Sequence, residues 1–299
     1  MKRKLVKQGT STMMISLPTK WIKENKLDKG DEVNVEEKGI NLVIGASEKK
    51  NTKKEIVIAL TDQNYKDLRV FLTHSYRRGF DKIILTGYLE EASKEINSLV
   101  SDVLLGFEVV ERAKDKIAIE NISSPDETKY EIILSKVFII VKDMPNIILN
   151  KPNISELKET KDHCDKFVLF CRKIISENKF TENPMLEWEF LTLLTHVQHT
   201  YYYLGEYIHT NKVTISKDLE SLILESGNYF NLLYEAHHNK DITQINKINS
   251  LKNKFQYGKC LELIAKSKGK EAVAASYLRE IFRWIQISSS PLLSKLLEK

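Results

Sequence analysis

The first part of the chain alternates between short apolar runs and turn residues on the scale of strands. Met13 to Leu17 is apolar and partly β-branched, as a half-buried strand should be, and it follows an extended basic run from Lys4 to Lys7 and a turn that begins at Gly9. Pro18 then predicts the start of a helix, because its fixed φ suits the first helical turn and no backbone donor is lost there. Two strands followed by a short helix are therefore expected.

A second pair of strands is predicted after that helix. Val33 and Val35 alternate with polar neighbours, and Leu42 and Ile44 do the same beyond Gly39, which is the pattern of a hairpin. Few residues could form a core: Ile15, Leu17, Trp21, Val33 and Leu42. A unit of about 45 residues cannot bury enough apolar surface to be stable alone. A second copy or another domain therefore has to cover residues 1–46.

Residues 55–122 predict a small α/β module, which follows a polar, lysine-rich linker at 47–54. Strands are expected at 55–60, 82–86, 107–112 and 116–122, and helices at 64–78 and 90–105. Arg77-Arg78-Gly79, at the end of the first of these helices, could hold an anion. No Gly-rich phosphate loop follows a strand, however, so a solvated helix end that stops at glycine is the favoured interpretation.

From residue 127 to the end, apolar residues recur at intervals of three and four, which is the period of helices. In 183–211 they fall at Leu186, Phe190, Leu193, Val197, Tyr201, Leu204 and Ile208. Proline, glycine and asparagine breaks, one of them at Pro145, separate six predicted helices at 128–141, 153–179, 183–211, 214–238, 242–267 and 270–287. Short loops between them are typical of antiparallel bundles. The expected fold class is therefore multidomain α+β, with an all-α domain at 127–299.

Positive charge is concentrated at the N-terminus. Residues 1–29 contain eight Lys or Arg and two acids, a balance of +6, whereas the whole chain carries +5. A local basic excess of this kind is the electrostatic footprint of a surface that lies on phosphates. The alternative is a solvated charged face without a partner.

The same unit carries a specific motif. It contains Lys7-Gln8-Gly9, Ser11-Thr12, Ile15-Ser16-Leu17-Pro18 and Trp21, followed by Leu27 and Gly30-Asp31-Glu32-Val33. This arrangement resembles the swapped-hairpin DNA-binding domain of the AbrB/SpoVT family. The similarity is greatest to the archaeal branch, whose pattern is G-x-S-T-x-x-x-S-L-P-x-x-W followed by L-x-x-G-D-x-V. The resemblance covers residues 1–46 and leaves the rest of the chain to be interpreted separately.

The resemblance implies both a partner and an oligomeric state. In that family, hairpins from two protomers interleave, so a homodimer or a higher homo-oligomer is expected, with double-stranded DNA as the partner. Family members place basic residues near the first strand and the helix on DNA; the matching positions are Arg3, Lys4, Lys7, Lys20 and Lys23. Some domains of the family only dimerise or bind toxins, so an N-terminal unit that does not bind DNA stays open.

Six helices behind such a unit resemble archaeal relatives of the phosphate-uptake regulator PhoU, which is built from two three-helix bundles. That likeness implies a sensing or partner-binding domain and a possible protein partner in phosphate uptake. PhoU proteins hold metal clusters on E/D-x-x-x-D motifs, and this chain departs from them. The positions four after Glu156, Glu159, Asp162, Asp218 and Glu220 are Thr160, His163, Lys166, Leu222 and Leu224. Metal binding of the family type is therefore in doubt.

Two other polar groups could hold a metal. His196 and His199 lie three residues apart on one predicted helix, but no third ligand is evident, and an aromatic-rich helix face with polar tips is favoured. A polar stripe follows an earlier helix at Glu159, Asp162, His163 and Asp165. Lysines interleave with these acids, so a solvated helix face is the favoured interpretation.

The remaining signals exclude several classes of protein. The cysteines, Cys164, Cys171 and Cys260, predict reduced core thiols in a cytoplasm rather than a disulfide framework. No apolar run approaches the roughly 20 residues of a membrane span, and the N-terminus lacks the apolar stretch of a signal peptide. No nucleophile elbow, Walker loop, zinc knuckle or acid/base pair occurs, so no catalytic residue, metal or cofactor is predicted.

The sequence therefore favours a cytoplasmic, dimeric, DNA-binding transcription regulator linked to phosphate homeostasis. The alternative is an adaptor that uses its N-terminal domain only to dimerise and its helices to hold a phosphate transporter or a signalling partner. A metal-dependent enzyme built on the bundle is a third possibility, disfavoured by the missing carboxylate motif.

Overall fold

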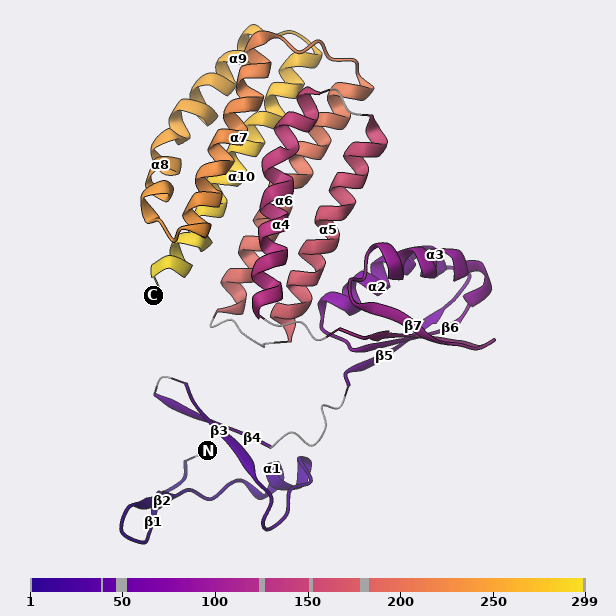
Figure 1. The fold of residues 1–299 in the computed structure, drawn as a ribbon, viewed down its shortest axis with the longest axis vertical. Coiled ribbons are helices and arrows are strands. Elements are labelled where there is room, and N and C mark those ends of the chain that lie inside the picture. Colours follow the sequence, from indigo (N-terminus) through magenta and orange to yellow (C-terminus); the bar gives the residue numbers. More distant parts are fainter. Residues whose placement is uncertain are drawn as a thin grey trace. The chain divides into compact units, whose positions relative to one another are not determined.

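The computed structural model describes residues 2–38, 40–46, 53–123, 127–150, 153–177 and 183–297. The chain divides into two compact units between Lys53 and Lys54, and each unit is considered by itself. The first has small β-sheets and a short helix, and the second is mostly helical, so the chain is a multidomain α+β protein (Figure 1). The predicted linker at 47–54 lies outside the described residues except for its last two positions.

Two antiparallel hairpins flank a short helix in the N-terminal unit. They are β1 (Val6–Gln8) with β2 (Thr12–Met14), then α1 (Thr19–Glu24), then β3 (Val33–Lys38) with β4 (Asn41–Ala46). This is the order that the sequence predicts. The predicted second strand was too long, because β2 ends at Met14 rather than at Leu17. Met14 pairs with Val6 at the end of the ladder, so the residues that follow have no strand to pair with in the described part of this unit.

The second unit begins with a four-stranded sheet. Its elements are β5 (Glu55–Leu60), η1 (Tyr65–Asp67), α2 (Leu68–Arg77), β6 (Lys82–Gly87), α3 (Leu89–Asp102), β7 (Phe107–Arg112) and β8 (Lys116–Asn121). The strand order is β5-β6-β8-β7, with β5 parallel to β6 and the other pairs antiparallel. Helices α2 and α3 cover one face, onto which alternate residues such as Ile83, Leu85, Ile117 and Ile119 are buried. Burial alternates along the edge strand β5, whereas each of the central strands β6 and β8 buries three consecutive residues.

Helices make up the rest of the second unit. They are α4 (Glu127–Leu149), α5 (Ile154–Ser176), α6 (Pro184–Thr210), α7 (Lys217–His238), α8 (Ile242–Lys252), the π-helical segment η2 (Asn253–Lys259), α9 (Cys260–Lys266) and α10 (Lys270–Leu297). Side-chain caps fix four of the starts: Asn153, Asn183, Ser216 and Asp241 each accept a backbone N–H from the first turn. Since α8, η2 and α9 are continuous, the described residues form the six helical stretches that the sequence predicts.

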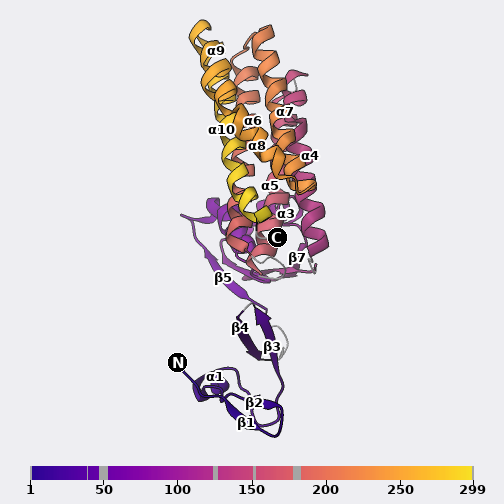
Figure 2. The same cartoon turned by 90° about the vertical axis from the view of Figure 1, so that its left-hand side faces the viewer.

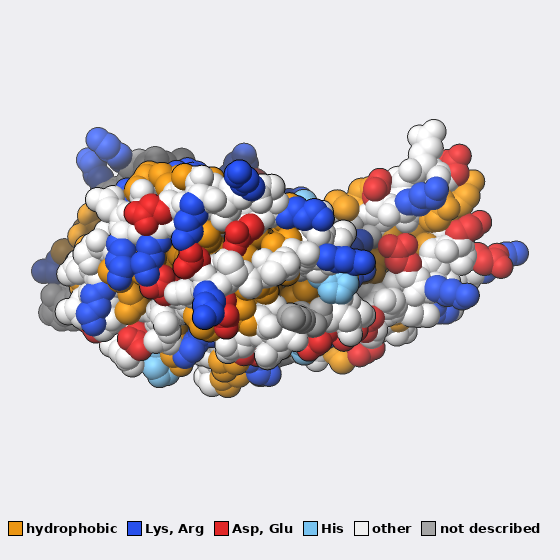
Figure 3. Space-filling model, turned by 90° about the horizontal axis from the view of Figure 1, so that it is seen from above, with side chains coloured by type: hydrophobic (Ala, Val, Ile, Leu, Met, Phe, Trp, Pro, Cys, Tyr) orange, Lys and Arg blue, Asp and Glu red, His pale blue; other side chains and the backbone are white. Residues whose placement is uncertain are grey.

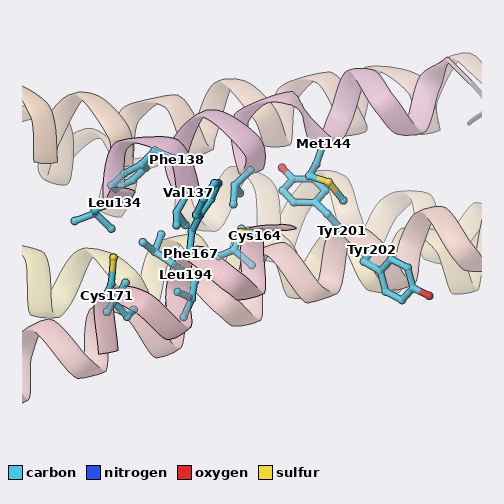
Figure 4. Close-up of a cluster of buried hydrophobic side chains, with 14 of the residues drawn as sticks. Leu134, Val137, Phe138, Met144, Cys164, Phe167, Cys171, Leu194, Tyr201 and Tyr202 are labelled. Carbon is cyan, nitrogen blue, oxygen red and sulfur yellow. The ribbon is translucent and has the colours of Figure 1, made fainter. Parts of the chain in front are cut away.

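The helices pack as two triplets, α4 to α6 and α7 to α10. Within each triplet the helices contact one another, and the triplets meet where α4 packs on α7 and α6 packs on α10 (Figure 2). Buried side chains of α4, α5 and α6, among them Phe138, Cys164, Leu194 and Tyr201, fill the first triplet (Figure 4). In the described part of the chain, no helix is long and apolar enough to cross a membrane.

Two predicted helix ends were wrong, both at prolines. Helix α4 continues through Pro145 to Leu149, and α10 continues through Pro291 to Leu297. A proline inside a helix removes one hydrogen bond and costs about 3 kcal/mol. At Pro145, the compensation is tertiary packing, because the ring lies against Gly227 on α7, where a Cβ would approach Pro145 Cγ to 3.0 Å. The facing glycine therefore makes room for the proline within the bundle.

Helix α2 of the sheet packs beside α5 of the bundle, which joins the two parts of the second unit. Arg69 forms an ion pair with Asp162 at 3.8 Å, and farther along both helices Ser176 donates a hydrogen bond of 2.6 Å to the carbonyl of Arg77. The two contacts advance together along the sequence, so the helices run in the same direction. Gly79, at φ +75°, then lets the chain turn away closely past α5.

A buried lysine closes this joint. The side chain of Lys173 is 1% exposed, its ammonium group pairs with Glu177, and it lies 5.4 Å from the ring centroid of Phe107 and 5.9 Å from that of Tyr76. The hydroxyl of Tyr76 donates to the carbonyl of Leu105 at 2.7 Å. Because a buried charge is stable only when it is paired, Lys173 and Glu177 depend on each other for the stability of the joint.

Polar side chains also lie inside the bundle, between α4, α6, α7 and α10. Glu187 accepts a hydrogen bond of 2.7 Å from the hydroxyl of Tyr130 and pairs with Lys295 at 2.6 Å. His237 stacks on Phe190, with ring centroids 5.9 Å apart and planes inclined by 7°. Burial and then the nearby Lys295 hold the pKa of His237 well below its usual value of 6.5, so this imidazole is neutral in the folded protein.

Replacement of Lys173 by Ala should strongly destabilise the second unit, because it removes one partner of an ion pair in which both side chains are buried. Removing one partner of a buried pair costs about 3–5 kcal/mol. Urea denaturation followed by circular dichroism measures the effect. The matched control is Lys266→Ala, since Lys266 pairs with Asp218 at the surface, where both side chains are more than half exposed. Equal denaturation midpoints for the two variants would contradict the assignment.

Stability of the helical bundle should fall as the pH decreases below about 6.5, because unfolded His237 takes up a proton that the folded protein excludes. For a base whose folded pKa is depressed, the free energy of unfolding rises with pH, by at most about 1.4 kcal/mol per pH unit for one group. Denaturant titrations between pH 5 and pH 7.5 measure this slope. It should decrease in His237→Phe and stay unchanged in His238→Gln, whose imidazole is exposed. The same slope in all three proteins would refute the role of His237.

Candidate nucleic-acid interface

The first three of the five predicted basic residues lie on and before the β1–β2 hairpin. Lys7 is in β1, opposite Met13 of β2, and Arg3 and Lys4 precede that strand. The turn between the strands contains Gly9 at φ +75°, a backbone conformation that glycine adopts at little cost. All three basic side chains are exposed. The hairpin thus presents a cationic strand edge that no neighbouring carboxylate covers in the described part of the chain.

The other two predicted residues, Lys20 and Lys23, project from α1. Pro18 is the N-cap of this helix rather than its first residue, and its carbonyl accepts the first helical hydrogen bond, from Ile22, at 3.0 Å. Lys20 lies 3.8 Å from Glu24, but the side chains are 87% and 62% exposed. Water and salt screen a pair this exposed, so it holds Lys20 only weakly. Both lysines therefore remain available to an anion.

The structure places these five side chains on two elements that are joined by a short segment, residues 15–18. The principal contacts within the unit are those between the paired strands of each hairpin. The five cations are exposed, and the hairpin and the helix are close in sequence. Such an arrangement can neutralise phosphates.

Apolar side chains of this unit are exposed as well. Among the residues whose side chains the structure describes between 2 and 46, none is buried. The large exposed ones are Leu5, Val6, Met13, Met14, Ile15, Val35, Ile40, Leu42 and Val43, all at least 44% exposed. Burying one such side chain contributes about 1.5–3 kcal/mol. Covering most of them can therefore offset the roughly 4–15 kcal/mol that association costs.

The second unit shows the opposite distribution of charge. From above, Lys and Arg side chains alternate with Asp and Glu over its surface, and no large patch of one sign is visible (Figure 3). Charges of both signs pair at this surface, as in Lys259 with Glu225. Long-range attraction of a polyanion therefore favours the N-terminal unit.

His196 and His199 do not converge on one point. His196 stacks on Trp284 at a centroid distance of 4.6 Å, whereas His199 Nε2 lies 2.8 Å from Asp165 Oδ1 on α5. No group of three His, Cys, Asp or Glu side chains with a geometry suited to a metal ion occurs among the described residues. The absence of a bound metal stays a prediction. His196 and His199 contact different side chains and do not form a pair of ligands.

The interpretation of the polar stripe on α5 as a solvated face was wrong for Asp165. Its side chain is 19% exposed and bonds both His199 and, at 2.8 Å, Lys161. Burial alone would raise the pKa of Asp165, but the hydrogen bonds from His199 and Lys161 outweigh it and keep the pKa below its usual range. The partner on α6 could not be seen from sequence, because it lies 34 positions away on another helix.

The cysteines are confirmed as buried free thiols. Cys164, Cys171 and Cys260 form no disulfide, and burial raises the pKa of each, that of Cys260 to about 12. Thiols with such pKa values are poor nucleophiles. They belong to the packing of the core.

No family model, curated protein or solved structure matches this chain.

Full-length protein should be at least a dimer, held by the apolar side chains of the N-terminal unit. Met13→Asp and Leu42→Asp should shift it toward the monomer in sedimentation equilibrium, because each would place a charge in the covered surface. Ile139→Asp is the control: Ile139 is as exposed as Met13, at 61%, but lies on α4 of the second unit. A monomeric wild type, or dissociation caused only by Ile139→Asp, would contradict this interface.

Proposed function

We propose that this protein is a DNA-binding transcription regulator that engages duplex DNA as a homodimer or higher homo-oligomer. The contacts come from Arg3, Lys4, Lys7, Lys20 and Lys23 of the N-terminal unit. The helical unit acts as the sensing or partner-binding part, in a cytoplasmic pathway of phosphate homeostasis.

The observation that carries the proposal is the coincidence of charge and exposed apolar surface in one small unit. The five predicted contact residues, all exposed, and nine exposed large apolar side chains occur within residues 2–46. A second copy would cover the apolar side chains and double the cations. The ten cations of a dimer can neutralise phosphates of a DNA duplex, which carries a phosphate charge about every 1.7 Å along its axis.

The motif from Lys7 to Val33 supports the same proposal, because it resembles the swapped-hairpin domain of the AbrB/SpoVT family. Such a domain would interleave two hairpins of the kind seen in β1–β2 and β3–β4. Within one chain these hairpins bury no described side chain, as expected if their packing partner is another copy.

The link to phosphate rests on the helical unit. Two triplets of helices that meet through α4–α7 and α6–α10 agree with the two three-helix bundles of PhoU. The first helices of the two triplets, α4 and α7, pack on each other, and so do the third helices, α6 and α10. The contact between the triplets therefore has approximate two-fold symmetry. This architecture supports a sensing or docking role, since the unit has a core of its own and a surface of mixed charge.

Communication between the units follows from oligomerisation. A change in how the helical units associate would change how many N-terminal dimers engage DNA together, and linked sites bind far more tightly than single ones. The helical part thus regulates by avidity, and its removal should leave weaker binding that no longer responds to a partner or effector.

Affinity for a DNA duplex should fall steeply with salt concentration in the full-length protein. Each neutralised phosphate contributes about 0.9 to the slope of log K against log salt, so ten contacts give a slope of about −9. Alanine at all five basic positions should remove most of this slope and most of the affinity. Fluorescence anisotropy with a labelled genomic duplex at several salt concentrations measures both quantities.

The control removes the same charge from the second unit, at the exposed Lys94, Lys114, Lys158, Lys217 and Lys268. That variant should bind DNA like the wild type. Should the N-terminal variant bind equally well, these five residues are not the DNA contacts. Should neither wild type nor control bind any duplex, the protein is an adaptor whose N-terminal unit only dimerises.

A further inference from the structure

Strand β5 lies at one edge of the sheet in the second unit, and part of its backbone faces away from that sheet. In the described part of the chain it pairs with β6 alone. The carbonyls of Lys54 and Leu60 accept backbone hydrogen bonds of 3.1 and 3.2 Å from β6 and from the residue after it. Because backbone groups point alternately to the two sides of a strand, those of Glu55, Val57 and Ala59 point outward.

The outward groups of β5 are mostly without hydrogen-bond partners among the described residues. The exception is the carbonyl of Ala59, which accepts a hydrogen bond of 3.3 Å from the side-chain amide of Asn64. A carbonyl oxygen has two lone pairs, so that of Ala59 can accept a second hydrogen bond. The outward edge of β5 is therefore able to pair with a further strand.

The other edge of the sheet, β7, is protected against such pairing. It has a bulge between Val109 and Glu111 and carries charged side chains at Glu108, Glu111 and Arg112. Bulges and charges are features with which proteins block edge strands. β5 has the sequence Glu-Ile-Val-Ile-Ala-Leu and a regular register with β6, without proline, lysine or bulge. The two edges of one sheet thus differ in how open they are to another strand.

The side chains of β5 are also incompletely covered. Ile56 and Ile58 lie on the face that α2 and α3 cover, yet both are only half-buried (Figure 1). Val57 lies on the opposite face and is 61% exposed. A neighbouring apolar strand would remove these three side chains from water.

We propose that β5 pairs antiparallel with β5 of a second copy of this chain, with Val57 opposite Val57 of the second copy. In this register the two valines exchange both of their backbone hydrogen bonds, and Glu55 does the same with Ala59 of the second copy. On the helix-covered face, Ile56 lies opposite Ile58 of the second copy. Every outward backbone group gains a partner, and the two sheets become one across a two-fold axis.

Charge at the two ends of β5 favours this orientation. Lys53 and Lys54 precede the strand, and Asp62 follows it by two residues. Antiparallel pairing brings the basic end of one copy beside the acidic end of the other, whereas parallel pairing would bring lysines together. Opposite charges across a strand pair stabilise it, and like charges destabilise it. The second copy is therefore complementary to the edge in hydrogen bonding, apolar surface and charge.

The inference rests on the dimer of the proposed function. A pair of six-residue strands is small compared with stable interfaces, which bury at least about 1,200 Å². The N-terminal units would hold two copies together, and the linker at 47–54 leads directly into β5. Such a link raises the effective concentration of the second strand to the order of millimolar. The strand pairing would then join the second units of the two copies directly.

Cross-linking of full-length Val57→Cys tests the pairing. Opposite residues that exchange hydrogen bonds have Cα atoms about 5.5 Å apart, a distance that suits a disulfide. Mild oxidation should give a covalent dimer on a non-reducing gel. Wild type should give none, because Cys164, Cys171 and Cys260 are buried. The matched control is Val110→Cys, which places an exposed thiol on the protected strand β7 and should not cross-link.

Two further cysteine variants test the register. Glu55→Cys or Ala59→Cys alone would place the two thiols more than about 13 Å apart, so neither should cross-link. Mixed dimers, made by co-expressing the two variants, should cross-link. Cross-linking of Glu55→Cys alone or of Val110→Cys as efficiently as Val57→Cys would overturn the proposal.

A charge on the edge tests the contribution to association. Val57→Lys should weaken self-association by at least about tenfold in sedimentation equilibrium, because it places a charge beside its own copy in the second chain. Val110→Lys should associate like the wild type. Equal association of wild type and Val57→Lys would contradict the pairing.

The pairing and the proposed function fail separately. A wild type that is dimeric and binds DNA, combined with a Val57→Cys variant that does not cross-link, would refute the strand pairing alone. Efficient cross-linking of Val57→Cys in a protein that binds no duplex would refute the DNA-binding function alone. Adding Met13→Asp to Val57→Cys should reduce cross-linking, because it removes the tether between the copies.

Discussion

The N-terminal unit depends on apolar side chains that it cannot bury by itself. Its two hairpins are too small to enclose a core, and residues such as Met13 and Leu42 stay more than half exposed in one chain. We therefore propose that association is a condition of stability for this unit, because it would remove these side chains from water. The same residues that demand a second copy lie among the exposed cations, so dimer formation and concentration of positive charge become one event. In this proposal, DNA binding and oligomeric state cannot be varied independently.

The second unit, in contrast, buries most of its apolar side chains within one chain. It has a continuous apolar core that runs from the sheet through both helical triplets, and its surface charges are of both signs. Stability of this part does not require a partner, which leaves its surfaces free for recognition. The parallel packing of α2 on α5 makes the sheet and the bundle a single unit.

Ion pairs and side-chain hydrogen bonds inside the second unit fix how its elements meet. Lys173 with Glu177 lies at the joint, Glu187 with Lys295 links α6 to α10, and Asp165 with His199 links α5 to α6. Buried pairs of this kind contribute little net stability, because desolvation offsets most of the attraction. Their main effect is to raise the free energy of other helix packings. A shift of one helix by a turn would leave a charge unpaired in the interior.

Sequence alone determined the type and order of the elements, because periods of two and of three to four residues follow directly from strand and helix geometry. It also located the concentration of basic residues before residue 30, which is a local property of the chain. Tertiary structure decided what depends on a distant neighbour. Gly227 on α7 accommodates Pro145 within a helix, His199 on α6 bonds Asp165 on α5, and Ser176 on α5 bonds the carbonyl of Arg77 on α2. Each of these outcomes depends on an interaction between two segments that are far apart in the chain. The residue pattern of one segment alone cannot predict it.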